Sequence, residues 1–120
     1  FEPVFPDWDA LKRKIVTVIT AIYGERVIVC KDELEHALKH FILPQDIFLE
    51  LLERVLKDPS EIFVDDLKSP HVYHIFYRLE SGRYLMAVVK LAEDGNYLAS
   101  MYPTGKRIRG LHRKMKRLKI

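Results

Sequence analysis

The sequence predicts an α+β domain in which two or three N-terminal helices pack on a four-stranded antiparallel sheet, with a short C-terminal helix as an open alternative. Apolar residues recur with a helical period as far as residue 57, and after residue 60 they follow the two-residue period of strands. The breaks between the later strand patterns are short, which favours antiparallel hairpins over parallel crossovers. With 120 residues and 48% apolar composition, the chain is long enough for one domain with its own core.

The first predicted element is an N-terminal helix over residues 6–24. Asp7 is its expected N-cap and Gly24 its stop, and apolar residues at helical spacing lie between them. The run from Ile15 to Thr20 is β-branched, which leaves a strand as the alternative for this stretch.

Two further helices are expected. The second begins at Asp32, because Glu35 three residues later completes a capping-box pattern. The third has Pro44 in its first turn and ends at the Asp-Pro-Ser sequence of residues 58–60.

The core of the domain is assigned to residues 26–105 and the basic tail to residues 106–120. The core is expected to contain strands at 26–30, 61–65, 72–79, 84–91 and 97–102. Strict alternation places Leu98, Ser100 and Tyr102 on one face of the last strand. Whether Lys90 of the preceding strand shares that side depends on the register, which the sequence leaves open.

Charge is distributed unevenly along the chain. Residues 106–120 hold eight Lys and Arg and no acid, which leaves twelve Lys and Arg against seventeen acids in the rest. A cationic tail on an acidic body points to a polyanionic partner, with RNA, DNA and anionic lipid as candidates. Cys30 is the only cysteine, which excludes an internal disulfide, and no apolar run is long enough to span a bilayer, so we expect a soluble protein.

His36 and His40 are the first candidates for chemistry. They lie one turn apart on the predicted second helix, and an imidazole can exchange protons near neutral pH. A metal site is an alternative, although the string HALKH lacks the glutamate of the HExxH motif. A plain pair of surface histidines is the other alternative.

The second candidate region is YLASMYPTGKRIR, residues 97–109, where a strand pattern runs into the tail. Its hydrogen-bond donors suit a phosphodiester: Ser100, Tyr102, Thr104, Lys106, Arg107 and Arg109. A last strand followed by a solvated tail is the alternative. A weaker group on residues 71–78, in which Tyr73, His74 and Tyr77 alternate with basic residues, is typical of sheets that stack on single-stranded RNA.

Together, these residues resemble the barnase/EndoU/colicin/RelE-like (BECR) nucleases, especially their small phage- and toxin-associated branch. The shared order is a short strand, a helix opening DELEHALKHF, an amphipathic helix ending LKDPSEIFVDD, and hairpins HVYHIFYRL, RYLMAVVKL and NYLASMYPTGK. The match runs from about Arg26 to Arg109.

The resemblance implies a metal-independent ribonuclease without a cofactor. In this family's chemistry the 2′-hydroxyl attacks the adjacent phosphate, which gives a cyclic phosphate and a free 5′-hydroxyl. The family's helix histidine corresponds to His36, with His40 as its companion, and its last-strand Thr/Ser-x-Tyr/Phe pattern corresponds to Ser100 and Tyr102. Ser100 stands where many members carry threonine, a departure that keeps the hydroxyl.

RNA cleavage needs a base, an acid and fixed positive charge near the phosphorus. We therefore expect His36 and His40 to move protons, Ser100 and Tyr102 to orient the substrate, and the basic group after the last strand to clamp the phosphate. That basic group is Lys106 or Arg107. Further RNA contacts are expected from Lys90, Thr104, Arg109, Arg113, Lys114, Lys116 and Arg117.

The implied partner is RNA, with tRNA as a candidate substrate and an immunity or antitoxin protein as a candidate inhibitor. The expected location is the cytoplasm, or a target cytoplasm if the domain belongs to a larger toxin, and no membrane partner is expected. A non-catalytic RNA-binding module with the same sheet face and tail is the main alternative. A structural domain whose tail meets an acidic protein is a third, and helical spacing of apolar residues in 108–118 leaves a membrane-surface helix open.

Overall fold

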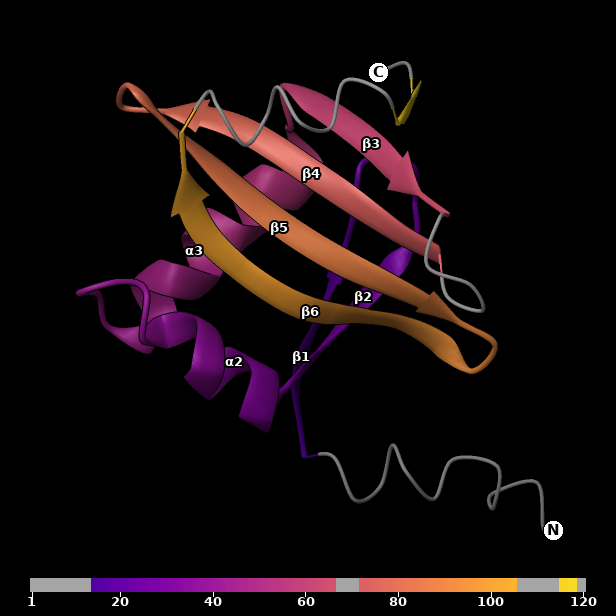
Figure 1. Ribbon diagram of the computed structural model, residues 1–120. Coiled ribbons are helices and arrows are strands. Elements are labelled where there is room, and N and C mark those ends of the chain that lie inside the picture. Colours follow the sequence, from indigo (N-terminus) through magenta and orange to yellow (C-terminus); the bar gives the residue numbers. More distant parts are fainter. Residues whose placement is uncertain (1–13, 67–71, 106–114, 119–120) are drawn as a thin grey trace, which may run out of the picture.

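The computed structural model describes residues 14–66, 72–105 and 115–118, which form one mixed sheet and two helices (Figure 1). The elements are β1 (Ile15–Thr20), β2 (Arg26–Cys30), α2 (Lys31–Leu38), α3 (Gln45–Lys57), β3 (Glu61–Asp65), β4 (Val72–Glu80), β5 (Arg83–Ala92), β6 (Gly95–Thr104) and β7 (Lys116–Leu118). The seven strands lie in the order β1-β2-β6-β5-β4-β3-β7. All neighbours are antiparallel except β2 and β6, which are parallel.

The predicted four-stranded antiparallel sheet is therefore wrong. The central meander from β3 to β6 was expected, but β1, β2 and β7 extend it on both sides. Beside β6, the extension arises because β2 pairs with it in parallel, which joins segments that are 70 residues apart in the chain. At this junction Asn96 Nδ2 also donates to the Arg26 carbonyl oxygen at 3.4 Å. Periodicity reports local structure and carries no information on such distant pairs.

The predicted helix over 6–24 is wrong in its described part, and residues 6–13 lie outside the described residues. All six residues of β1, IVTVIT, are β-branched and lose side-chain freedom in a helix, so they form a strand. A turn at Gly24, where φ is +90°, then reverses the chain into β2. The backbone of Ile22 donates to the Leu56 carbonyl at 2.9 Å, which ties this hairpin to the end of α3.

The two later helices lie where the sequence places them, with a difference at the start of each. Pro44, expected in the first turn of α3, is its N-cap. Cys30 is the N-cap of α2 and makes no side-chain capping bond, so the capping box at Asp32 is not formed. Asp32 lies instead in the first turn, where its charge suits the positive end of the helix dipole. The apolar stripe of α3 buries Phe48, Leu52, Val55 and Leu56, whereas Ile47, which was expected in the same stripe, is 40% exposed.

The β4–β5 hairpin forms through a tight turn. Strand β6 contains one irregularity, which changes the faces to which its side chains point. Ser81 and Gly82 both have positive φ, at 51° and 82°, as a two-residue type I′ turn requires. Between β5 and β6, Val88 faces Ser100 but Val89 faces Leu98, so β6 carries a bulge with one extra residue at Ala99. Strict alternation fails there, and Leu98 and Met101 enter the same core.

The possible C-terminal helix is wrong over Lys116–Leu118, which form β7 against β3. Residues 108–114 of that expected helix lie outside the described residues.

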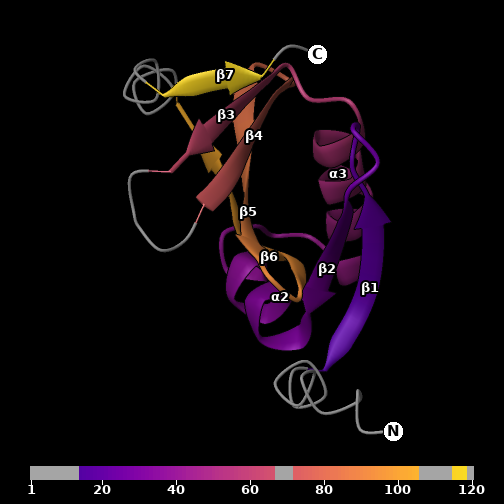
Figure 2. The ribbon, with the colours of Figure 1, turned by 90° about the vertical axis from the view of Figure 1, so that its right-hand side faces the viewer.

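The main core lies on one side of the central strands. There α3 and the β1–β2 hairpin face strands β3 to β6 (Figure 2). A smaller buried cluster occupies the opposite face of those strands and contains Phe63, Ile75, Tyr77 and Met86. Neither helix in the described part of the chain is long and apolar enough to cross a membrane.

Candidate functional site

The candidate site is built around the end of α2. The helix buries Leu34 and Ala37, which leaves His36 and His40 on its exposed side. His40 follows the last helical residue, and its N–H donates to the Ala37 carbonyl at 3.0 Å. The two imidazole rings lie edge to face with centroids 5.9 Å apart. The predicted pair is therefore a spatial pair, close enough for both rings to serve one substrate.

Strand β6 brings Tyr102 to this pair. β2 pairs with β6 only at Asn96 and Tyr97, so no described strand continues along that edge and α2 packs there instead (Figure 1). The rings of His40 and Tyr102 consequently lie 5.6 Å apart. Burial raises the pKa of the Tyr102 phenol above its ordinary value. The hydroxyl thus stays protonated at neutral pH and remains a hydrogen-bond donor.

Register places Ser100 and Lys90 on the face of Tyr102. Ser100 lies opposite Val88, and Tyr102 lies opposite Met86. Lys90 is two residues beyond Val88 on β5, so it shares that face. The question that the sequence left open is settled in favour of a common side. Leu98, which was expected on that face, lies on the opposite one because the bulge at Ala99 comes between it and Ser100.

A cavity of about 540 Å³ opens beside His40, between the end of α2 and the β4–β5 turn. Its polar lining comes from His40, Glu80, Ser81 and Arg83. Its apolar walls are Phe41, Ile42, Leu51, Leu85 and Pro103. A hollow of this size with an imidazole and a guanidinium at its rim suits a nucleotide-sized ligand.

Glu80 and Arg83, the acidic and basic residues that line this cavity, differ in whether they are paired with other side chains. Glu80 accepts hydrogen bonds from Arg54 at 2.7 Å and Arg78 at 2.9 Å, and the bond from Arg78 is the main cause that lowers the pKa of Glu80. Arg78 also reaches the carboxylate of Asp58 at 2.9 Å. Arg83, in contrast, has no ion-pair partner among the residues that the structure describes. Its positive charge is therefore available to an anionic ligand.

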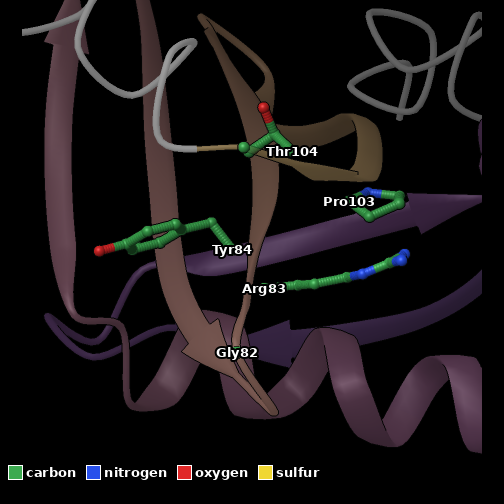
Figure 3. Close-up of a pocket in the computed structure, with 6 residues that line it drawn as sticks. Gly82, Arg83, Tyr84, Pro103 and Thr104 are labelled. Atoms are coloured by element: carbon green, nitrogen blue, oxygen red, sulfur yellow. The ribbon is translucent and has the colours of Figure 1, made fainter.

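A second cavity of about 350 Å³ adjoins the first, and Arg83 and Pro103 line both (Figure 3). Tyr84 and Arg83 extend to opposite sides of β5 there (Figure 3). Thr104 lines this cavity, and its buried hydroxyl has no hydrogen-bond partner among the residues that the structure describes. An unpaired buried hydroxyl costs about 1–3 kcal/mol, so it favours a ligand that can bond to it.

Several predicted residues lie elsewhere. Lys106, Arg107, Arg109, Arg113 and Lys114 fall outside the described residues. Lys116 and Arg117 lie on β7, which β3, β4 and β5 separate from β6. Arg117 Nε approaches the carboxylate of Glu61 at 3.8 Å.

Only part of the aromatic group on β4 is accessible: Tyr73 is half-buried, and His71 lies outside the described residues. Tyr77 is fully buried, and Arg78 is engaged by Asp58 and Glu80. His74 faces Val89 across the strand pair, which puts it on the main-core side, and it lies 3.9 Å from Glu25. Burial lowers the pKa of His74, while the charge of Glu25 acts in the opposite direction.

Sequence reasoning missed Arg83. It directly follows the Ser81-Gly82 turn, and its position beside His40 depends on how α2 packs against the sheet edge. A cation next to a tight turn at the end of a hairpin was the available signal, and it is a common surface pattern. Among the described residues, no group of three His, Cys, Asp or Glu side chains is close enough to hold a metal ion.

Comparisons with known proteins find no relative of this chain. No family model, curated protein or solved structure matches the chain.

Proposed function

We propose that the protein is a ribonuclease that cleaves RNA through attack of the 2′-hydroxyl, without a metal ion. The observation that carries this proposal is the position of His40, whose ring contacts those of His36 and Tyr102 and which lines a cavity together with Arg83. The reaction needs a proton acceptor, a proton donor and fixed positive charge. These side chains supply all three within one small region.

In the proposed reaction, His40 accepts the proton of the 2′-hydroxyl as that oxygen attacks the phosphorus. The O2′–P bond forms, the P–O5′ bond breaks, and protonated His36 delivers a proton to the departing 5′ oxygen. Arg83 and the Tyr102 hydroxyl stabilise the charge on the phosphorane oxygens. The products are a 2′,3′-cyclic phosphate and a 5′-hydroxyl.

In this proposal several of the predicted residues have roles different from those expected from the sequence. His36 was expected to lead, but His40 is the imidazole that contacts Tyr102 and borders the cavity. Arg83 takes the clamping role expected for Lys106 or Arg107. Thr104 supports a neighbouring phosphate from the second cavity, and Ser100 and Lys90 extend the donor surface along the face of Tyr102.

The proposal is tested with a labelled single-stranded RNA, tRNA and a 2′-deoxy copy of the first substrate, all in EDTA. Wild-type protein is expected to cut both RNAs to cyclic-phosphate ends and to leave the 2′-deoxy copy intact. His40→Ala should lower the rate about 10²- to 10⁴-fold, the usual contribution of a positioned acid or base. Tyr102→Phe keeps the ring and tests the hydroxyl alone.

Lys39→Ala is the matched control, because Lys39 is an exposed neighbour in the same turn. It should retain wild-type activity. Unchanged cleavage in both His36→Ala and His40→Ala would remove the assignment of these histidines. RNA that binds but stays intact after long incubation would indicate the non-catalytic RNA-binding module instead.

The remaining proposals follow from the sequence. We propose a relationship to the BECR nucleases, tRNA as a candidate substrate, an immunity or antitoxin protein as a candidate inhibitor, and action in a cytoplasm. They rest on the pattern of residues 26–109 and on the cationic tail.

A further inference from the structure

β1 is the outermost strand of the sheet at the end opposite to β7. Within Ile15–Thr20 there is no charged residue and no proline. Its apolar side chains remain accessible, with Ile15 49%, Val16 38% and Val18 47% exposed. The following turn adds Ile22 and Tyr23 at 41% and 47%.

Open strand edges are normally protected, because their free backbone N–H and C=O groups pair readily with another chain. Lysine, proline, a covering helix or a short length are the usual protections. β1 has six residues and no charge or proline, so these residues do not oppose the addition of a strand.

The side of β1 that faces α3 carries negative charge. A groove of about 270 Å³ runs between β1 and α3, and Asp46, Glu50 and Glu53 line it together with Thr17, Val18 and Ile19. Among residues 14–66, 72–105 and 115–118, no cation lines this groove. A second hollow of about 400 Å³ continues along α3 and shares Glu50 and Glu53 with the first. Arg54 and Lys57 line this second hollow, and Lys57 Nζ lies 3.1 Å from the carboxylate of Glu53, so a cation of a bound segment would share Glu53 with Lys57.

Successive residues of β1 point to opposite faces of the sheet, and the two faces differ in character. Ile19 is buried toward the main core on the α3 side, and Val18 points to the other face because successive residues alternate. A strand added to β1 would therefore meet carboxylates on one of its faces and exposed valine on the other.

We propose that β1 is a docking edge for an extended segment of a partner protein in which Lys or Arg alternates with apolar residues. The segment adds to the sheet by backbone hydrogen bonding to β1. Its cations lie over Glu50 and Glu53, and its apolar residues pack beside Val18. This interaction is separate from the proposed nuclease site.

A second copy of this chain is the less suitable occupant. Antiparallel pairing of β1 with another β1 requires a two-fold axis perpendicular to the sheet, which places both α3 helices on the same face. Their rows of Asp46, Glu50 and Glu53 would then approach one another. Like charges in that arrangement oppose association.

The test uses the full chain and two fluorescein-labelled eight-residue peptides, one repeating Lys-Val and the other repeating Thr-Val. Binding is measured by fluorescence anisotropy at two salt concentrations, and the contact is located by amide hydrogen exchange. We expect the Lys-Val peptide to bind at least about tenfold more tightly than the Thr-Val peptide, with salt weakening it. Exchange should slow in residues 15–20.

Two variants probe the two parts of the surface. Glu50→Gln with Glu53→Gln removes the charge, and Val18→Lys places a cation on the edge, so each should weaken binding of the Lys-Val peptide about tenfold. The matched control is Glu35→Gln with Glu93→Gln, which makes the same change in net charge at exposed positions away from the groove. It should bind like wild type.

Four results would overturn the proposal. One is equal affinity for the two peptides. The second is protection from exchange outside β1, and the third is equal weakening by the control variant. The fourth is a dimer in sedimentation experiments that Val18→Lys dissociates, since that would make a second copy the occupant of this edge.

Discussion

At the scale of single residues, the candidate site depends on a few ring contacts. His40 is placed by the end of α2 and Tyr102 by the bulged strand β6, and their rings meet at 5.6 Å. The sequence identified both residues because hydroxyls, phenols and imidazoles are recognisable by type. It did not identify Arg83, since a cation beside a turn is common and only the tertiary structure puts it next to His40.

His74 gives a prediction about pH at the same scale. Burial lowers its pKa below the unfolded value of 6.5, so the unfolded chain binds the proton more readily. The free energy of unfolding should therefore fall as pH drops below about 6.5 and should be unaffected by this group at higher pH. Urea unfolding at pH 5 to 8 measures this, and His74→Gln should reduce the pH dependence. An unchanged dependence in that variant would assign it to other groups.

At the scale of elements, local signals predicted most of what is local. The hairpins from β3 to β6 were predicted because their turns carry Gly and polar residues, and α3 because its stripe is strongly periodic. β1 was assigned to a helix, although its six β-branched residues left a strand open. The pairing of β2 with β6, and the bulge at Ala99, follow from contacts between distant segments and could not be read from periodicity.

The β2–β6 junction yields a prediction about stability. Gly95 has φ +153°, and a Cβ there would lie 3.1 Å from Cδ1 of Ile28 on β2. Gly95→Ala should therefore lower the free energy of unfolding by about 1–3 kcal/mol, from backbone strain and crowding together. Urea titration measures the loss.

Ile28→Val removes the atom that the new methyl group would meet. The double variant Gly95→Ala with Ile28→Val should be more stable than the sum of the two single losses indicates, because part of the crowding is relieved. Additive losses would mean that the strain lies in the backbone alone.

At the scale of the whole molecule, charge and topology separate three surfaces. The acidic groove lies at the β1 edge, the candidate site lies where α2 meets β6, and the cationic residues of β7 lie at the opposite end of the sheet. The uneven charge was evident from the sequence. Its arrangement around the sheet was not, because strand order depends on pairing between distant segments.

A prediction about salt belongs to this scale. If RNA extends from the site to β7, replacing Lys116 and Arg117 with Gln should weaken binding and lower the salt slope of log K by about 1.4, at about 0.7 per cation for single strands. Binding titrations at several salt concentrations measure the slope. Arg26→Gln with Lys31→Gln makes the same charge change on β2 and α2 and should leave the slope nearer that of wild type. Equal slopes in the two variants would show that the effect comes from net charge and not from contact.

The parallel pairing of β2 with β6 also sets an order of events in time. Arg26 and Asn96 are separated by 70 residues, so on a ribosome the β1–β2 hairpin emerges well before the strand beside which it belongs. During that interval both edges of a hairpin rich in β-branched residues are open, which exposes the nascent chain to wrong pairing. The β1–β2 hairpin can join the sheet only after β6 has been made, because β6 is the strand with which β2 pairs.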